Sequence, residues 1–419
     1  MTDVSGVSDV SDVSDVCKAN EVADEQPALS FPFPAADPWE PAPEFAELRG
    51  RDRMGRVTLP TGDTAWIATR YEDNRQLLSD PRFSRAAAAR AGAPRVRRAA
   101  LETRSLTTMD PPEHTRLRRI AVRAFTTQSV DRLRPRIRQV TGGLLDTLAA
   151  AGPGADLVAE VARPLPVTVM CELLGVPAGD QARFGAWSRV YLSAVGHSAE
   201  EIESAAASLK GYLARLIGDK RRRPGDDLLS RLAHAPEEER LDEEELVTFG
   251  VTLLVAGVET VVHEISGGVL ALLRAPEQWE RLRARPALLD GAVEELIRFT
   301  PAAVSGGTLR VALEDVELGG VLVRAGEAVL PAVIAADRDP GVFPDPDRLD
   351  VTRRPNPHIG FGHGPHRCLG AQLARAELGI ALGSLIARFP GLRLAVPVTE
   401  LEWVLQGMQR GPKALPVRW

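Results

Sequence analysis

A long apolar segment of about 32 residues, Asp242–Leu273, most restricts how this chain can fold. Asp242 and Glu245 form a capping-box pattern at its start, and Pro276 follows its end, where a helix stop is expected. A helix of this length extends about 48 Å at 1.5 Å per residue, the full width of a domain of this size. The segment therefore predicts a helix that crosses the core.

Other stretches with helical periodicity predict a fold that is mainly α with small β-sheets. They are residues 110–125, 129–150, 164–174, 199–222, 286–299 and 369–388. Strand-like pieces at 308–312 and 321–329 and a hairpin-like segment at 57–69 lie between them. No βαβ alternation appears, and no other break in composition follows the N-terminal tail, so residues 29–419 are expected to form a single domain. Residues 4–16 repeat Val-Ser-Asp with one Gly variant, and residues 1–28 are expected to form a disordered low-complexity tail.

Composition excludes several classes of protein. The net charge of −6 argues against a chain built to hold nucleic acid or an anionic membrane surface. No stretch reaches the roughly 18–20 continuous apolar residues of a membrane-spanning helix. Three cysteines are too few for a disulfide framework, a four-cysteine zinc site or an iron–sulfur cluster. A reducing, cytoplasmic location is therefore expected.

One cysteine lies in a loop whose chemistry favours metal binding. The loop runs Phe361-Gly-His-Gly364-Pro-His366-Arg-Cys368-Leu-Gly370 and leads into a predicted helix. The unpaired amides at a helix N-terminus favour a thiolate, which is the form that binds a metal. Gly364 permits a tight turn, Gly370 leaves room for a flat cofactor, and Phe361 could shield the sulfur. The alternative is an inert buried cysteine that caps a packed helix.

The loop resembles the haem-binding loop of the cytochrome P450 superfamily, which has Phe and Gly at these spacings before its Cys and Gly two residues after it. Glu295-Leu-Ile-Arg298 matches the family's Glu-x-x-Arg motif, and residues 343–348 match the segment that supplies the third member of its buried charge network. The resemblance is to soluble, actinobacterial specialised-metabolism enzymes and covers nearly everything from about residue 30. It implies the cytochrome P450 fold, one haem b with Cys368 as iron ligand, and a structural network of Glu295, Arg298 and Arg348.

A second part of the resemblance concerns the haem propionates. His114 and Arg118 lie four residues apart on a predicted helix, so both side chains point the same way. Such a pair is otherwise a solvated helix face. The resemblance implies that both residues hold the propionates, with Arg310 and His366 as further donors.

The resemblance also implies a monooxygenase that activates O2 to hydroxylate a substrate. Glu259 and Thr260 match the family's acid–alcohol pair: Thr260 is expected to hydrogen-bond dioxygen during its activation, and Glu259 to relay protons from solvent. Gly257 is expected to open the helix slightly. The alternative is that Thr260 bonds its own helix and Glu259 is solvated.

Electrons are expected from partner proteins, a ferredoxin and a ferredoxin reductase. No Gly-x-Gly-x-x-Gly follows a strand, and no flavin or iron–sulfur segment is fused to the chain. A landing patch for an acidic ferredoxin is expected from five arginines, with scattered surface arginines as the alternative. They are Arg116, Arg119, Arg123, Arg367 and Arg375.

The segments expected to line the substrate pocket predict a small apolar or aromatic substrate. They are expected from residues 86–108, 186–204, 251–260 and 302–308, which carry small and apolar groups. Residues 403–409 are expected to fold back toward the pocket. Two alternatives remain: oxidative C–C or C–N aryl coupling of a phenolic or cyclic-dipeptide substrate at the same haem, and a non-catalytic haem-binding protein. The Glu259-Thr260 pair disfavours the second.

Overall fold

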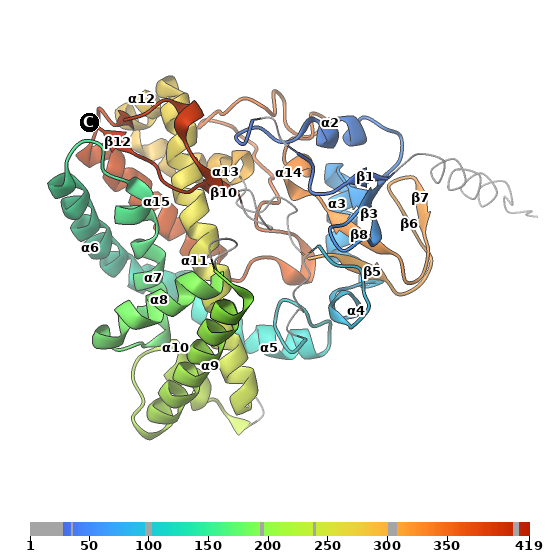
Figure 1. Cartoon of the computed structure of the whole chain (residues 1–419), viewed down its shortest axis with the longest axis horizontal. Coiled ribbons are helices and arrows are strands. Elements are labelled where there is room, and N and C mark those ends of the chain that lie inside the picture. Colours follow the sequence, from blue (N-terminus) through green and yellow to red (C-terminus); the bar gives the residue numbers. More distant parts are fainter. Residues whose placement is uncertain are drawn as a thin grey trace, which may run out of the picture.

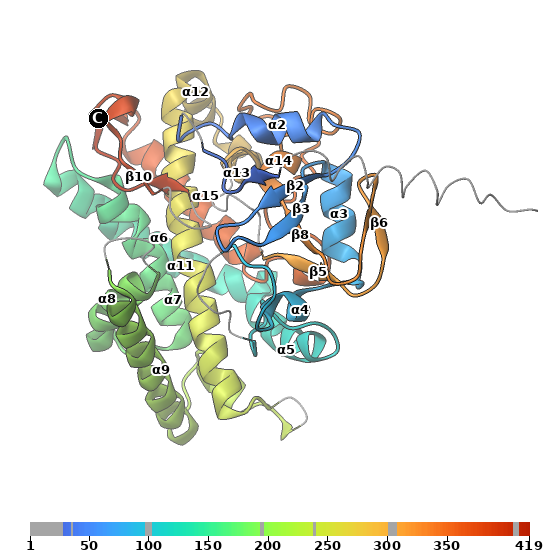
Figure 2. The ribbon, with the colours of Figure 1, turned by 45° about the vertical axis from the view of Figure 1, so that its right-hand side comes forward.

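The computed structural model describes residues 28–34, 37–96, 103–192, 197–237, 240–300, 308–404 and 410–419. Most of the long helices lie on one side of the molecule and the largest sheet lies on the other, with the yellow helix α11 between them (Figures 1 and 2). The mainly α architecture predicted from periodicity is therefore confirmed. The predicted tail 1–28 lies outside the described residues except for Ala28.

Helix α11, Glu243–Arg274, is the long helix that the sequence predicts. Its capping box is present: the Asp242 carboxylate accepts the Glu245 N–H at 2.7 Å, and the Glu245 carboxylate accepts the Asp242 N–H at 3.0 Å. The helix is continuous through Gly257, so the predicted opening there is absent. Gly257 instead admits a neighbour, because a Cβ on it would lie 2.8 Å from the Met170 sulfur.

Among the described helices, α11 alone is long and apolar enough to cross a membrane by length and composition. The sequence prediction concerned continuous apolar residues, and Glu259 and Glu264 interrupt the apolar run of this helix. However, 71% of its most apolar window is buried inside the protein, which is typical of a core helix.

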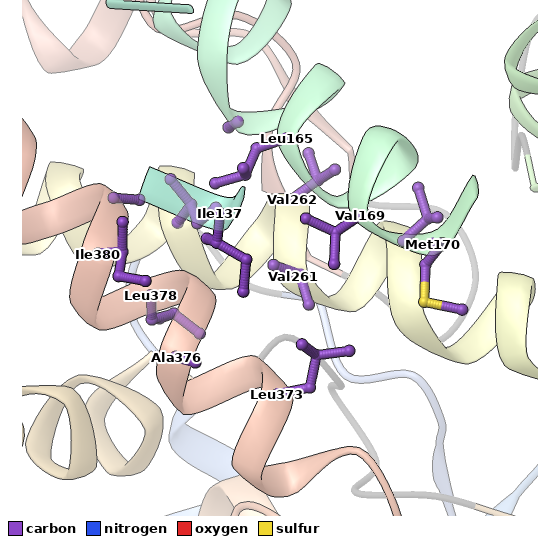
Figure 3. Packing of buried hydrophobic residues seen from close by; sticks show 14 of the residues in the cluster. Ile137, Leu165, Val169, Met170, Val261, Val262, Leu373, Ala376, Leu378 and Ile380 are labelled. Carbon is purple, nitrogen blue, oxygen red and sulfur yellow. The ribbon is translucent and has the colours of Figure 1, made fainter. Parts of the chain in front are cut away.

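The other helices pack around α11 or continue from it. They are α5 (Glu113–Val122), α6 (Thr127–Ala151), α7 (Pro164–Leu174), α8 (Gln181–Leu192), α9 (Ala199–Arg222), α10 (Leu228–Ala233), α12 (Pro276–Ala284), α13 (Leu289–Phe299) and α15 (Ala371–Arg388). Figure 3 shows aliphatic side chains of α7, α11 and α15 meeting around Ile137 of α6. Burial of such side chains stabilises the fold by roughly 1.5–3 kcal/mol each before chain entropy is counted. This packing fixes α15, whose N-terminus follows the cysteine loop.

The main sheet has six strands in the order β1-β2-β3-β8-β5-β4. Their bounds are β1 Leu29–Ser30, β2 Gly55–Thr58, β3 Thr64–Ala68, β4 Phe83–Ser84, β5 Arg310–Ala312 and β8 Ala328–Pro331. Strands β2 and β3 form the predicted antiparallel hairpin, with Val57 opposite Ala65. Strand β3 pairs with β8 in parallel, and β8 pairs with β5, which carries Arg310. The sheet thereby holds one predicted site residue.

Short elements complete the structure. Helices α2 (Pro43–Arg49), α3 (Tyr71–Ser79), α4 (Arg85–Ala89) and α14 (Val333–Ala336) lie on the sheet side. Three two-stranded sheets remain, namely β6 (Val316–Leu318) with β7 (Val321–Val323), β9 (Arg393–Leu394) with β12 (Val417–Arg418), and β10 (Trp403–Val404) with β11 (Gly411–Pro412).

Candidate active site

The cysteine loop is held by its own backbone and by close packing. The Cys368 N–H donates to the Phe361 carbonyl at 2.7 Å, and a short 3-10 turn, Gly364–His366, lies between them. Gly364 has φ +68, and a Cβ there would lie 2.4 Å from the Leu78 carbonyl, so only glycine fits this turn. A Cβ on Gly370 would meet nothing within 4 Å, so open space adjoins this position. The loop thus combines a rigid turn with room beside the cysteine.

The Cys368 thiol is free and accessible. Burial of the loop raises its pKa, whereas a bond from the Gly370 N–H and the nearby Arg118, Arg367 and Arg375 act to lower it. Arg118 also donates to the Arg367 carbonyl at 2.5 Å, which ties α5 to the loop. These donors and cations support a thiolate once a metal ion adds its own positive charge.

Five cationic or titratable donors meet next to this loop: Arg85, His114, Arg118, Arg310 and His366. The His114 and His366 rings lie 4.0 Å apart between centroids, and Arg310 is 3% exposed. Burial and the neighbouring cations lower the pKa of His114 to about 4 and lower the pKa values of His366 and Arg310. Positive charge is therefore concentrated here at a cost in free energy that an anion would offset.

Among the described residues, Asp110 is the acid beside this cluster, and its charge favours the protonated forms of Arg85, His114 and Arg310. Its carboxylate accepts the Ser84 hydroxyl and the Arg85 backbone N–H rather than a side-chain N–H of the cluster. The His114 Nε2 and Arg85 Nε atoms are buried without a hydrogen-bond partner. Arg85, Arg310 and His366 also line a cavity of about 40 Å³. Buried cations with unsatisfied N–H groups fit a ligand that carries carboxylates, as haem does.

Sequence reasoning anticipated four of the five donors and missed Arg85. Its guanidinium donates to the Thr308 hydroxyl at 2.7 Å, and burial lowers its pKa to about 10. No sequence pattern separates Arg85 from the many other arginines of this chain. Its position depends on the pairing of β4 with β5, which brings it to Arg310.

The acid and alcohol on α11 have defined partners. The Thr260 hydroxyl donates to the Ala256 carbonyl at 2.6 Å, so it bonds its own helix in this structure. Glu259 is 8% exposed and accepts the Arg163 guanidinium at 2.6 Å, so it is not a solvated side chain. Glu259 and Arg163 border a cavity of about 260 Å³. Protons could reach the carboxylate from this cavity.

His263 is a second partner of Glu259 that sequence reasoning missed. Its Nε2 lies 3.8 Å from the Glu259 carboxylate, and burial and Arg163 lower its pKa to about 4. The signal was available, because residues four apart on a helix face each other. Arg163 comes from 96 positions away in sequence, and no local pattern could have identified it.

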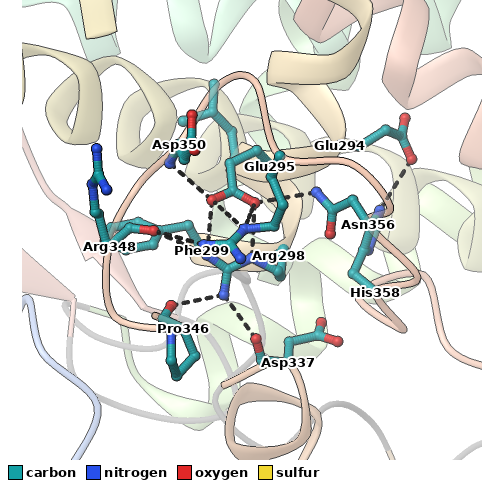
Figure 4. A network of polar contacts seen from close by, with 12 residues as sticks. Glu294, Glu295, Arg298, Phe299, Asp337, Pro346, Arg348, Asp350, Asn356 and His358 are labelled. Carbon is teal, nitrogen blue, oxygen red and sulfur yellow. Dashed lines mark hydrogen bonds and ion pairs between the residues drawn. The ribbon is translucent and has the colours of Figure 1, made fainter. Parts of the chain in front are cut away.

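The buried charge network is present, with one member different from the prediction (Figure 4). Glu295 and Arg298 are fully buried and joined by two bonds of 2.8 Å. The third side chain is Arg353, whose Nε lies 3.1 Å from both Glu295 oxygens. Arg348 was the wrong choice: its side chain is exposed, and only its carbonyl oxygen accepts bonds from the network.

The arginine patch predicted for a ferredoxin is smaller than expected. Arg116 pairs with Glu245, and Arg375 makes a two-bond ion pair with Glu294. Arg119, Arg123 and Arg367 are exposed. Two of the five arginines are thus neutralised by carboxylates on other helices.

Parts of the predicted substrate pocket lie outside the described residues. These are 97–102 and 193–196, which are parts of two predicted walls, and 301–307, which include most of a third, together with 405–409 of the C-terminal segment. Trp403, at the described end of that segment, lies 6.2 Å from the Trp39 ring.

Comparison with known proteins identifies the family. Residues 284–393 match the family model described as Cytochrome P450. The chain is 49% identical over 391 residues to the Nocardicin C N-oxygenase of Nocardia uniformis subsp. tsuyamanensis, covering 93% of this chain and 98% of the relative. It is 46% identical over 391 residues to the Mycinamicin IV hydroxylase/epoxidase of Micromonospora griseorubida, covering 93% and 98%. The crystal structure of the LnmA cytochrome P450 hydroxylase from the leinamycin pathway of Streptomyces atroolivaceus S-140 superposes with a TM-score of 0.87 at 49% identity, covering 94% of this chain and all of that one.

The fold and these relatives define an oxidoreductase that uses haem iron and dioxygen. The chain belongs to the cytochrome P450 family, and it is a P450 monooxygenase of the bacterial specialised-metabolism type. The predicted family, fold class and enzyme class are confirmed.

Proposed function

We propose that this enzyme binds haem b through Cys368 and hydroxylates a small apolar or aromatic specialised metabolite. The buried cluster of Arg85, His114, Arg310 and His366 carries this proposal, because Asp110 is the one carboxylate that the described residues place beside it, two of its nitrogen atoms have no partner, and it adjoins the cysteine loop. Two propionates would give these donors charge-assisted hydrogen bonds. Arg118 would complete the set from α5.

The residues of the cysteine loop then have distinct roles. Bound haem supplies the activation of dioxygen, which a thiolate ligand favours by donating electron density to iron. The Gly370 N–H bonds the Cys368 sulfur, and Gly364 fixes the turn. Phe361 holds the cysteine backbone through its carbonyl.

Proton delivery falls to Glu259 and Thr260. Glu259 borders the 260 Å³ cavity, from which its carboxylate can accept a proton when its bond to Arg163 opens. The Thr260 hydroxyl donates to Ala256 and keeps its oxygen lone pairs free to accept a proton from the Glu259 side. The pair therefore supports catalysis rather than haem binding alone.

The electron donors of this enzyme would be separate proteins, a ferredoxin and its reductase. In the described part of the chain, no cluster of three or more His, Cys, Asp or Glu residues is suited to a metal ion. The exposed Arg119, Arg123 and Arg367 would receive the acidic ferredoxin. Cys171 and Cys368 are free thiols, in keeping with a reducing cytoplasm.

The test is turnover with surrogate ferredoxin and reductase under isotopically labelled dioxygen, for substrates that shift the haem spin state. The proposal predicts one labelled oxygen in the product and little peroxide per electron consumed. Dimeric product without label would instead show aryl coupling. Peroxide formation with every spin-shifting ligand, and no organic product, would contradict the enzymatic role.

A further inference from the structure

Two consecutive glutamates on α13 serve different networks. Successive side chains on a helix point about 100° apart, and Figure 4 shows Glu294 and Glu295 diverging in this way. Glu295 enters the buried network of Arg298 and Arg353. Glu294 instead turns toward α15 and the loop that precedes the cysteine. The Glu-x-x-Arg motif accounts for Glu295 and leaves Glu294 unexplained.

Glu294 joins the two chain segments that flank Cys368. From α15, seven residues after the cysteine, Arg375 donates its Nε and Nη2 to the two Glu294 oxygens at 2.6 and 2.7 Å. From the loop, ten residues before the cysteine, the His358 Nε2 lies 3.0 Å from the Glu294 Oε2. Although burial alone would raise it, the bonds from Arg375 and His358 hold the pKa of Glu294 at about 2. The carboxylate is therefore charged and bound on both sides of the cysteine.

Both partners of Glu294 also contact the ring of Phe361. The Arg375 guanidinium lies 4.5 Å from the ring centroid, and the His358 ring centroid lies 6.0 Å from it. The His358 side chain is 4% exposed, so this contact is buried on the loop side. The Phe361 carbonyl in turn accepts the Cys368 N–H. A chain of direct contacts thus runs from Glu294 to the cysteine.

Arg375 also brings positive charge close to the cysteine. It is one of three arginines near Cys368, with Arg118 and Arg367. Its ion pair with Glu294 offsets part of that charge. Removal of either member should therefore change the electrostatic potential at the sulfur, in opposite directions.

We propose that Glu294, His358 and Arg375 are positioning residues for the cysteine ligand, which clamp the two segments around Cys368 and set the charge near its sulfur. This proposal rests on the proposed function, in which Cys368 binds the haem iron. His358 and Arg375, the partners of Glu294, act on Cys368 through Phe361 and the loop backbone.

The test compares haem-loaded Glu294→Gln, Arg375→Leu and Arg375→Lys with the wild type and a control, Glu280→Gln. Glu280 also pairs with an arginine, Arg283 at 2.7 Å, but on the exposed surface of α12. Two quantities are measured: the midpoint reduction potential, and the rate at which the carbon-monoxide complex loses its thiolate-type absorption band.

The potential should rise in Glu294→Gln, because an anion is lost, and fall in Arg375→Leu, because a cation is lost. Arg375→Lys keeps the charge and should restore the potential, but it loses the planar two-bond geometry and the contact with Phe361. Its thiolate band should therefore decay several-fold faster than in the control. Purely structural damage would not give potential shifts of opposite sign.

If the three variants match Glu280→Gln in both measurements, the positioning role is overturned. A normal thiolate-type band in the wild type would then leave the proposed function intact. Shifts of the same sign in Glu294→Gln and Arg375→Leu would also overturn the positioning role. A wild-type enzyme without the thiolate band would overturn the proposed function, and this proposal with it. His358→Gln gives a second check on the loop side, with faster band decay expected.

Discussion

Replacing Arg353 should destabilise the protein far more than replacing Arg348. The Arg353 side chain is 9% exposed and bonds both Glu295 oxygens as well as three carbonyls, those of Pro344, Asp345 and Arg348. Arg353→Met would leave the Pro344 carbonyl and part of the buried Glu295 charge without a donor, and it would remove one of two donors to the Asp345 and Arg348 carbonyls. Breaking a buried ion pair in this way costs about 3–5 kcal/mol. Arg348 is exposed and contributes its backbone, so Arg348→Ala should change stability by about 0.5 kcal/mol or less.

The assay is guanidinium unfolding of both variants and the wild type at one fixed haem concentration, because bound haem adds to apparent stability. The free energy of unfolding is obtained from far-ultraviolet circular dichroism. If the two variants lose equal free energy of unfolding, or if Arg353→Met loses less than about 1 kcal/mol, the assignment of Arg353 to the network is refuted.

Three further predictions follow from the site. Thr260→Ala should retain haem and substrate binding but divert electrons to hydrogen peroxide, whereas Thr260→Ser should stay coupled; full coupling in the alanine variant would exclude the hydroxyl from proton delivery. Arg310→Leu should weaken haem binding by roughly tenfold to a hundredfold, the loss of one charged hydrogen-bond donor, measured by haem transfer to apomyoglobin; unchanged transfer would remove Arg310 from the propionate site. Burial raises the pKa of Glu377 from 4.5 to about 8, so the native state binds the extra proton and wild-type stability should fall as pH rises from about 4.5 to about 8. Glu377→Gln should lack this fall, so at about pH 8 its free energy of unfolding should exceed that of the wild type by up to roughly 4–5 kcal/mol. If the free energies of unfolding in urea change with pH in parallel for the two proteins, the prediction is contradicted.

Local signals predicted the fold well. Periodicity and the capping box placed the central helix at 242–273, and it runs from Glu243 to Arg274. The segment at 369–388 became α15, Ala371–Arg388, and the hairpin at 57–69 became β2 and β3. These features depend on residues a few positions apart, which sequence shows directly.

Long-range contacts could not be predicted in the same way. Arg348, Arg353 and Arg354 lie within seven positions, and spacing alone cannot show which side chain turns inward. The choice depends on how the loop after α14 folds against α13, where Arg353 lies against Glu295. Arg116 and Arg375 were assigned to a surface patch because their carboxylate partners, Glu245 and Glu294, lie far away in the sequence.

The most direct test of the proposed function is the absorption spectrum of the dithionite-reduced protein under carbon monoxide. The proposed Cys368 thiolate predicts a strongly red-shifted Soret band that disappears in Cys368→Ser. A band at the position typical of histidine-ligated haem in the wild type, or an unchanged spectrum in Cys368→Ser, would contradict Cys368 as the iron ligand.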